Sequence, residues 1–190
     1  MAKFTVYVAL LRGINVGGSN KIAMADLISC FERLGYDHVR TYINSGNVIF
    51  SAPSTNARAI ELQIEKALDA TFSLPIRVII RSVQEMRQVV QAMPPEWGSQ
   101  AADLKCDVIF VRHTIDSPKL LERFHVNPAV EELIYHPGVL LWSVKSKDFS
   151  RSGFTKVNQM DIYQDMTVRG PNSVRKIYEL MQQLPGVPAV

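Results

Sequence analysis

A glycine- and asparagine-rich segment, Arg12 to Lys21, is the stretch of this chain whose residue types could do chemistry. It reads Arg-Gly-Ile-Asn-Val-Gly-Gly-Ser-Asn-Lys and lies between an apolar run and a helical pattern. A turn before a helix exposes backbone N–H groups that have no partner within the helix, and these groups attract anions. With a cation at each end, the segment predicts a site for a small anionic or phosphorylated ligand. It matches neither the Walker A pattern nor Gly-x-Gly-x-x-Gly, and a tight crossover from strand to helix without a ligand is the alternative interpretation.

Two further polar turns carry groups of the same kind. The run Asn44 to Asn47 has a common hairpin-turn composition, and in the expected fold the hairpin lies near an edge available for binding. Arg169 and Asn172 precede the last helical pattern, where Asn172 either caps the helix or helps to hold a carboxylate or phosphate. We expect the glycine-rich segment and the Arg169 turn to converge. The candidate ligand-binding residues are Arg12, Asn15, Gly17, Gly18, Lys21, Ser45, Asn47, Arg169 and Asn172.

Neither a catalytic residue nor a metal site or cofactor is indicated by the sequence. The four histidines lack the HxH and HExxH spacings of metal ligands. No serine lies in the Gly-x-Ser-x-Gly elbow of hydrolases. Whether the chain is an enzyme, and its oligomeric state, are therefore left open.

The residues up to Ser82 predict the elements that would position these turns. Apolar residues alternate or recur at helical spacing in the order strand, helix, strand, strand, helix, strand. That order is typical of a split βαβ, or ferredoxin-like, unit, in which both helices cover one face of the sheet. Asn56 is expected to cap the second helix. The expected strands are residues 4–11, 39–43, 48–50 and 76–80, and the first helix begins near Met24 and stops at Gly35.

The second half predicts another α+β unit. A capping box at Ser82 and Glu85 begins a helix that Pro94 and Pro95 end. Further elements are a strand at 106–111, a short helix from Pro118, a hairpin of strands at 130–135 and 139–144, and a last helix from Asn172 to about Leu184. Their order resembles that of the first half, without a convincing repeat of residues. The predicted fold class is α+β: a ferredoxin-like unit, residues 1–82, packed with a second α+β unit, residues 83–190.

Composition and charge are typical of a folded globular protein. Hydrophobic residues make up 47% and charged residues 21%, and the formal net charge of +3 is a weaker basic bias than nucleic-acid binders show. A single-stranded nucleic-acid-binding module is nevertheless one alternative function. A protein-interaction module without ligand chemistry is another. No apolar run approaches the ~20 residues that cross a bilayer, and the start lacks the apolar region of a signal peptide. Cys30 and Cys106 lack metal-ligand spacing and predict unpaired thiols, so we expect a cytoplasmic protein.

Three sequence blocks stand out in the first half: Arg12–Gly18, Lys21–Leu27 and Ser45–Phe50. Together they resemble a widespread bacterial family catalogued as a domain of unknown function, DUF 1697. The resemblance continues through residues 150–153, 167–169 and 174–180, so it covers nearly the whole chain. It implies a two-part α+β protein with a ferredoxin-like first unit, and it brings no activity, cofactor or catalytic residue.

One departure from that family lies before the last helix. Family members usually place Asn-x-Asn-Thr after Thr-x-Arg, where this chain has Gly170-Pro171-Asn172-Ser173. Asn172 is retained and Ser173 can replace the threonine hydroxyl. The first asparagine is absent, which puts in doubt any site that uses it.

Overall fold

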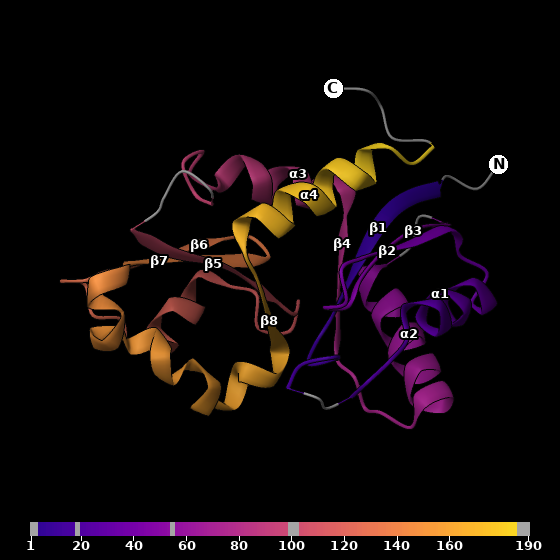
Figure 1. The fold of residues 1–190 in the computed structure, drawn as a ribbon, viewed down its shortest axis with the longest axis horizontal. Helices are drawn as coiled ribbons and strands as arrows, with labels where there is room; N and C mark the ends of the chain where they lie inside the picture. The colour runs from indigo at the N-terminus through magenta and orange to yellow at the C-terminus, as the bar shows by residue number, and fades with distance from the viewer. Residues whose placement is uncertain (1–3, 18–19, 54–55, 99–102, 186–190) are drawn as a thin grey trace. The chain divides into compact units, whose positions relative to one another are not determined.

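The structure is a computed structural model, and it describes residues 4–17, 20–53, 56–98 and 103–185. Two compact units divide the chain: one contains Met1–Met86 and Lys176–Val190, and the other contains Arg87–Arg175 (Figure 1). The boundaries fall inside two helices, α3 (Val83–Ala92) and α4 (Pro171–Gln182). The division into domains at residues 1–82 and 83–190 stays a prediction.

The first unit has the predicted ferredoxin-like topology. Its sheet has the strand order β2-β3-β1-β4, and every pair of neighbours is antiparallel. The fold class α+β is therefore confirmed. The elements are β1 (Phe4–Leu11), α1 (Met24–Arg33), β2 (Asp37–Tyr42), β3 (Asn47–Pro53), α2 (Ala57–Phe72) and β4 (Val78–Ser82).

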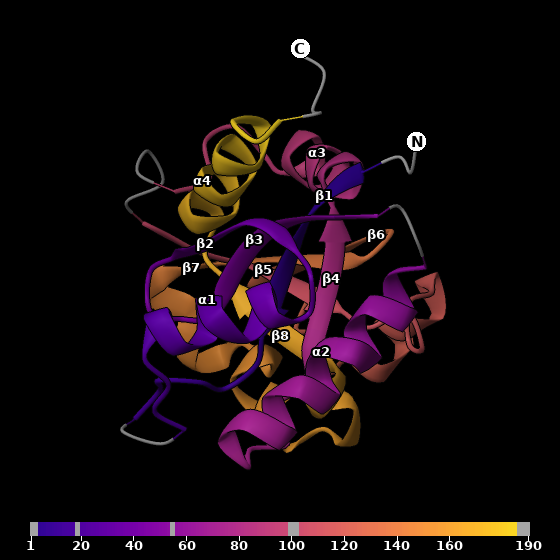
Figure 2. The ribbon, with the colours of Figure 1, turned by 90° about the vertical axis from the view of Figure 1, so that its right-hand side faces the viewer.

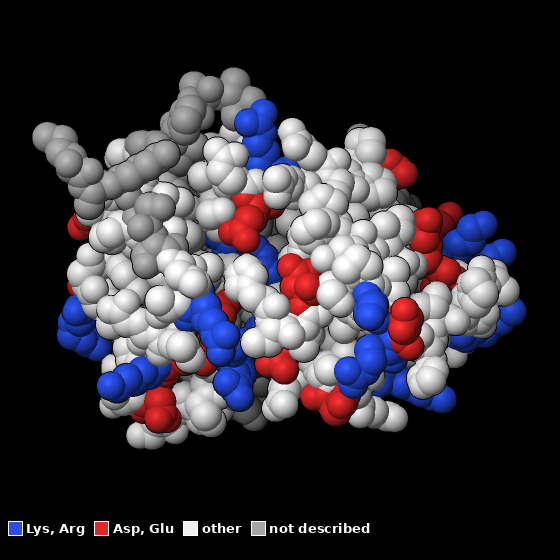
Figure 3. Space-filling view, turned by 180° about the vertical axis from the view of Figure 1, so that it is seen from behind, with Lys and Arg blue, Asp and Glu red and all other residues white. Residues whose placement is uncertain are grey.

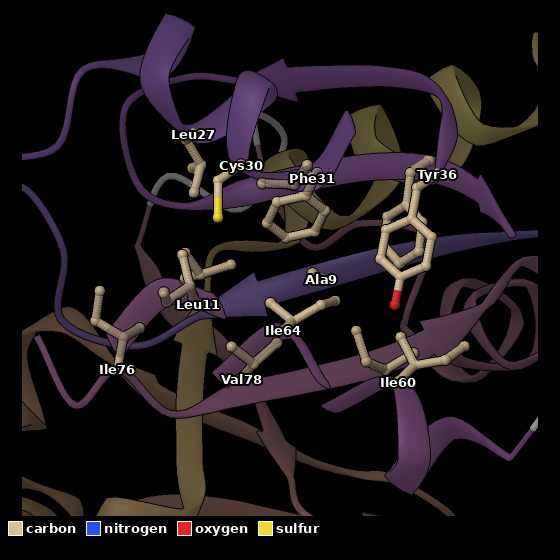
Figure 4. Close-up of a cluster of buried hydrophobic side chains, with 14 of the residues drawn as sticks. Ala9, Leu11, Leu27, Cys30, Phe31, Tyr36, Ile60, Ile64, Ile76 and Val78 are labelled. Carbon is tan, nitrogen blue, oxygen red and sulfur yellow. The ribbon is translucent and has the colours of Figure 1, made fainter. Parts of the chain in front are cut away.

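Both helices of this unit cover the same face of the sheet, as predicted (Figure 2). Successive strand side chains point to opposite faces, so every second residue of β1 shares a face. Ala9 and Leu11 on β1 lie in one buried cluster with Phe31 of α1 and with Ile60 and Ile64 of α2 (Figure 4). The leucine, isoleucine and phenylalanine side chains of this cluster each contribute about 1.5–3 kcal/mol by leaving water.

Helix starts follow the predicted capping chemistry. The Asn56 side chain accepts a hydrogen bond from the Arg58 backbone N–H at 2.9 Å, which caps α2. At the start of α3 the Glu85 carboxylate accepts from the Ser82 backbone N–H at 2.7 Å, and the Ser82 hydroxyl accepts from the Glu85 N–H at 3.3 Å. This reciprocal pair is a capping box. Both caps were predicted from the sequence and are confirmed.

The second unit has a sheet of the same topology with different connections. Its strand order is β6-β7-β5-β8, again antiparallel throughout. Short 3₁₀ helices stand where the first unit has α1 and α2. The elements are β5 (Leu104–Val111), η1 (Pro118–Arg123), β6 (Glu131–His136), β7 (Val139–Lys145), η2 (Ser146–Arg151), η3 (Gly153–Gln159), η4 (Asp161–Asp165) and β8 (Met166–Arg169).

The buried carboxylate of Glu131 fastens the connections of the second unit. It accepts hydrogen bonds from the Trp142 indole at 2.8 Å, the Asn127 backbone N–H at 2.7 Å and the Gly153 backbone N–H at 2.8 Å, and from the Ser152 hydroxyl. Burial by itself raises the pKa of this carboxyl, but the four hydrogen bonds outweigh burial and hold the pKa below its ordinary value. Glu131 thus joins β6, β7 and the start of η3.

Two expectations for the second half need correction. The strand β8 was not predicted, because its four residues are too few for an alternating pattern to appear. The last helix begins at Pro171, and the Val174 N–H donates to the Gly170 carbonyl at 3.1 Å, so Gly170 occupies the N-cap position. The prediction that Asn172 caps this helix is therefore wrong, because Asn172 lies within its first turn.

Candidate functional site

Two loops of the first unit, residues 12–22 and 43–46, are tied together at one end of the sheet. The Leu11 N–H donates to the Gly46 carbonyl at 2.8 Å. The Asn15 side-chain amide donates to the Asn44 carbonyl at 3.0 Å. The structure therefore brings together the glycine-rich segment and the hairpin turn, which the sequence singled out separately.

The side chain of Asn15 shapes the glycine-rich loop. Its Oδ1 accepts from the Ile22 N–H at 2.9 Å, while its Nδ2 donates to the Ile22 carbonyl and the Asn44 carbonyl, both at 3.0 Å. Asn15 and Asn20 both have positive φ, 55° and 48°, which asparagine tolerates better than most residues. Both N–H groups of the Asn15 amide are used by the protein, so this residue positions the loop.

Ser45 and Asn47 hold the hairpin turn. Asn47 is fully buried, and its Nδ2 donates to the Tyr42 carbonyl at 3.1 Å and the Ser45 hydroxyl at 3.0 Å. Positive φ falls on Ile43 and Gly46 of this turn. A Cβ added at Gly46 would lie 2.8 Å from the Leu11 Cβ at the end of β1 and 3.0 Å from the Ile14 side chain, so the close approach of the turn requires glycine.

An open hollow of about 510 Å³ lies beside the start of α1. Ala23 stands at the N-cap of α1 and has no polar side chain to occupy the N–H groups of the first turn. Lys21 is exposed at the hollow and supplies a positive charge, whereas Asp26, exposed in the first turn, supplies a negative one. The lining residues are Asn15, Lys21, Ile22, Ala23, Met24 and Asn44.

Arg12 and Gly17, two further predicted residues of the first unit, are not among the residues that line the hollow. Arg12 is half-buried, and its backbone N–H donates to the Arg77 carbonyl at 3.0 Å. Gly17 is exposed with φ of 58°. Gly18 lies outside the described residues.

Arg169 and Asn172 belong to the second unit. Arg169 is buried, and its Nη1 donates to the Thr167 hydroxyl and the Val168 carbonyl, both at 2.8 Å. Burial lowers the pKa of its guanidinium to about 10, so it is still a cation at neutral pH. Asn172 lies close to Gly98, where an added Cβ would come 2.1 Å from its Oδ1. Convergence of the Arg169 turn with the glycine-rich loop stays a prediction.

Tyr7, Tyr42 and Phe50 are the strand aromatics of the first unit that could stack nucleic-acid bases, and of these Tyr42 is half-buried. Tyr7 and Phe50 are buried in the cluster between the sheet and its two helices, where their ring centroids are 5.9 Å apart. Side chains in this position cannot stack on RNA bases, which needs an exposed sheet face. On the face shown in Figure 3, basic and acidic side chains are interspersed.

Other chemistry is limited within the described residues. No three His, Cys, Asp or Glu side chains gather there as a metal site would require. Cys30 and Cys106 are both free thiols, as predicted. None of the helices in the described ranges is long and apolar enough to cross a membrane.

The sequence did not single out every residue that builds this region. Asn20 donates to the Gly13 carbonyl at 3.0 Å, and the Asn44 and Gly46 carbonyls join the loops. The repeated asparagines were a visible signal, since asparagine is enriched at left-handed positions. The roles of the two carbonyls had no sequence signal, because any residue carries one.

Comparisons with known proteins agree with this architecture. The model of a family described as "Protein of unknown function (DUF1697)" matches residues 4–141. A solved structure, the conserved bacterial protein SP0830 from Streptococcus pneumoniae, is similar with a TM-score of 0.80 and 25% sequence identity. That similarity covers 94% of this chain and 99% of the other. No curated protein matches the chain.

Proposed function

The chain belongs to the DUF1697 family of proteins of unknown function, and from its first unit we propose that it binds a small anionic or phosphorylated ligand in the hollow beside α1. One observation carries this proposal. The helix α1 opens onto the hollow with Ala23 at its N-cap, and Lys21 lies on the same rim. N–H groups at a helix start and a nearby ammonium are the donors that an oxyanion accepts.

The surrounding hydrogen bonds support a rigid site. Asn15 fixes the backbone of Ile22 from both its N–H and its carbonyl, and it fixes the hairpin through Asn44. Loop geometry that is set before the ligand arrives reduces the entropy lost on binding. Asn15 is therefore a positioning residue, while Lys21 and the first turn of α1 contact the ligand.

The charges around the hollow give the proposal two variants with opposite expected effects. Lys21→Ala removes one charge-assisted hydrogen bond, about 1.5–3 kcal/mol, and should weaken binding of inorganic phosphate roughly tenfold or more. Asp26→Asn removes a competing negative charge from the same helix turn and should tighten phosphate binding. Both side chains are exposed, so urea unfolding of the two variants should stay close to wild type.

Isothermal titration with inorganic phosphate measures these effects. Lys66→Ala, which removes an exposed lysine from α2, is the matched control and should bind as the wild type does. Equal affinity of the Lys21→Ala, Asp26→Asn and Lys66→Ala variants would refute the site. A response to single-stranded oligonucleotide that Lys21→Ala leaves intact would favour the nucleic-acid alternative.

A further inference from the structure

The two units match in strand register as well as in strand order. In the first sheet, Val8 of β1 lies opposite Arg81 of β4. In the second sheet, Val108 of β5 lies opposite Arg169 of β8. The first strand of each unit is central in its sheet. The fourth strand carries an arginine at the same position of the ladder, which is the last residue but one of β4 and the last residue of β8.

The two units also share a backbone hydrogen bond between the last residue of the first strand and the hairpin turn. The Leu11 N–H donates to the Gly46 carbonyl at 2.8 Å, and the Val111 N–H donates to the Gly138 carbonyl at 3.1 Å. Gly46 and Gly138 both have positive φ, 75° and 85°, in the hairpin turn of their unit. In each unit, a tight turn with a left-handed glycine thus accepts a hydrogen bond from the last residue of the first strand.

A second pair of backbone bonds follows one residue later. The Arg12 N–H donates to the Arg77 carbonyl at 3.0 Å, and the Arg112 N–H donates to the Asp165 carbonyl at 2.9 Å. Both donors come directly after the first strand, and both acceptors precede the fourth strand. A chance likeness of two sheets would not reproduce the strand register, the turn contact and this bond together.

Arg81 and Arg169 are both buried and make the same backbone hydrogen bond. Arg81 is 1% exposed and Arg169 is 9% exposed. In each, Nη1 donates to the carbonyl of the preceding residue, Ile80 or Val168, at 2.8 Å. Burying a guanidinium costs free energy of desolvation. A buried guanidinium is therefore tolerated only where the protein supplies hydrogen-bond acceptors.

We infer that the two units are copies of one ancestral unit, and that Arg81 and Arg169 are equivalent framework residues, each fastened to the backbone of its own strand. Arg169 therefore stabilises the second unit and does not bind the anion. The loop of residues 13–23 has a shorter counterpart, residues 113–117, without its glycines. The hollow beside α1 belongs to the part of the first unit that the second unit does not repeat.

The assignment is tested by removing each guanidinium while keeping an unbranched side chain. Arg81→Met and Arg169→Met should both lower the midpoint of urea unfolding. Arg58→Met, at an exposed position of α2, is the control and should leave the midpoint close to wild type. If one buried variant fails to fold, this counts as the extreme form of the expected loss. The unfolding midpoint of the other variant then tests the equivalence.

The claim that Arg169 does not bind the anion rests on the proposed function. A separate measurement tests it, the titration of inorganic phosphate into folded Arg169→Met. Its dissociation constant should stay within about twofold of wild type, against the roughly tenfold loss expected for Lys21→Ala. A wild-type unfolding midpoint for only one of the two buried variants would overturn the equivalence. Tenfold weaker phosphate binding by folded Arg169→Met would overturn its framework role. If the wild-type chain binds no anion, the proposed function fails while the unfolding midpoints still judge the framework assignment.

Discussion

At the residue scale, the polar side chains of the candidate site fall into two groups. Asn15 and Asn47 direct their amides to backbone carbonyls within the first unit, and Asn47 is fully buried. Lys21 is exposed at the rim of the hollow. The asparagines therefore set the loop conformation, and the lysine is the group with freedom to meet a ligand.

Gly46 of the hairpin turn lies against Leu11 of β1 and Ile14 of the glycine-rich loop, and its replacement should be costly. Alanine at a positive φ loses roughly 1–2 kcal/mol relative to a right-handed conformation. At Gly46 the added Cβ would also lie 2.8 Å from the Leu11 Cβ and 3.0 Å from the Ile14 side chain. Forcing atoms into a packed region adds about 1–3 kcal/mol. We expect Gly46→Ala to lower the free energy of unfolding by roughly the sum of the two.

Gly13 provides the matched control for this substitution. Its φ is 66°, close to that of Gly46, but nothing lies within 4 Å of an added Cβ. Gly13→Ala should therefore show the backbone cost alone. Equal losses for both variants in urea unfolding would mean that the two loops separate easily.

At the scale of elements, irregular connections in the second unit take the place of the helices in the first. The 3₁₀ helices have poorer hydrogen-bond geometry than α-helices and depend on external ties. Glu131 supplies one such tie, by joining β6 to the Trp142 indole on β7 and to the backbone of Gly153 at the start of η3. In the second unit a side-chain carboxylate thus ties together connections that contain no α-helix.

Glu131→Gln should lower stability by about 2–4 kcal/mol at neutral pH, because an amide group cannot accept from all four donors. The pKa of Glu131 is depressed in the folded chain, so its stabilising effect is present above the ordinary glutamate value of about 4.3. That effect is lost as the pH falls through the folded pKa. The difference in unfolding free energy between wild type and variant should therefore shrink in acid. A difference that stays constant down to pH ~2 would contradict this role.

Asp107 of β5 should show the opposite pH dependence. Burial raises its pKa to about 6, although Lys105 lowers it in part. The folded chain thus holds this proton more tightly than the unfolded chain does. The stability of the folded chain should therefore fall as the pH rises from the ordinary aspartate pKa of about 3.9 to about 6.

Asp107→Asn should remove this pH dependence. We expect the variant to be more stable than wild type at pH 7.5 and similar to it at pH 4. Asp69→Asn, at an exposed position of α2, makes the same chemical change at the surface and serves as the control. Urea unfolding at the two pH values decides the matter, and an equal change at both would exclude titration of Asp107 as the cause.

The sequence predicted elements where the local signal was strong. Apolar alternation located β1, and Asn56 with apolar residues at helical spacing located α2. The strand β8 escaped because its four residues give too short a pattern. In the candidate site, Asn15 was recognised as important, but its partner Asn44 lies 29 residues away. Such a contact depends on the folded sheet and leaves no local trace.

At the scale of the whole molecule, the chain consists of one topology used twice. The repeat was hidden in the sequence because the separation between equivalent residues shrinks along the chain. It runs from Val8 and Val108 at the first strands to Arg81 and Arg169 at the fourth strands. Shorter connections in the second unit cause this drift, and a search for a fixed period cannot detect it. Topology and register reveal the relation, since they do not depend on loop length.

The central place of β1 in its sheet bears on how the chain folds while it is being made. β1 pairs with β3 and β4, and β4 ends at Ser82. At a synthesis rate of about 5–20 residues per second, roughly 4–14 s separate the emergence of Leu11 from that of Ser82. During this interval an apolar strand leaves the ribosome without its final partner, and exposed strands of this kind are prone to aggregate. β5 repeats the situation, since its partner β8 ends only at Arg169. Each unit therefore passes through one interval in which its central strand lacks its final partner, and slower translation should lengthen both intervals.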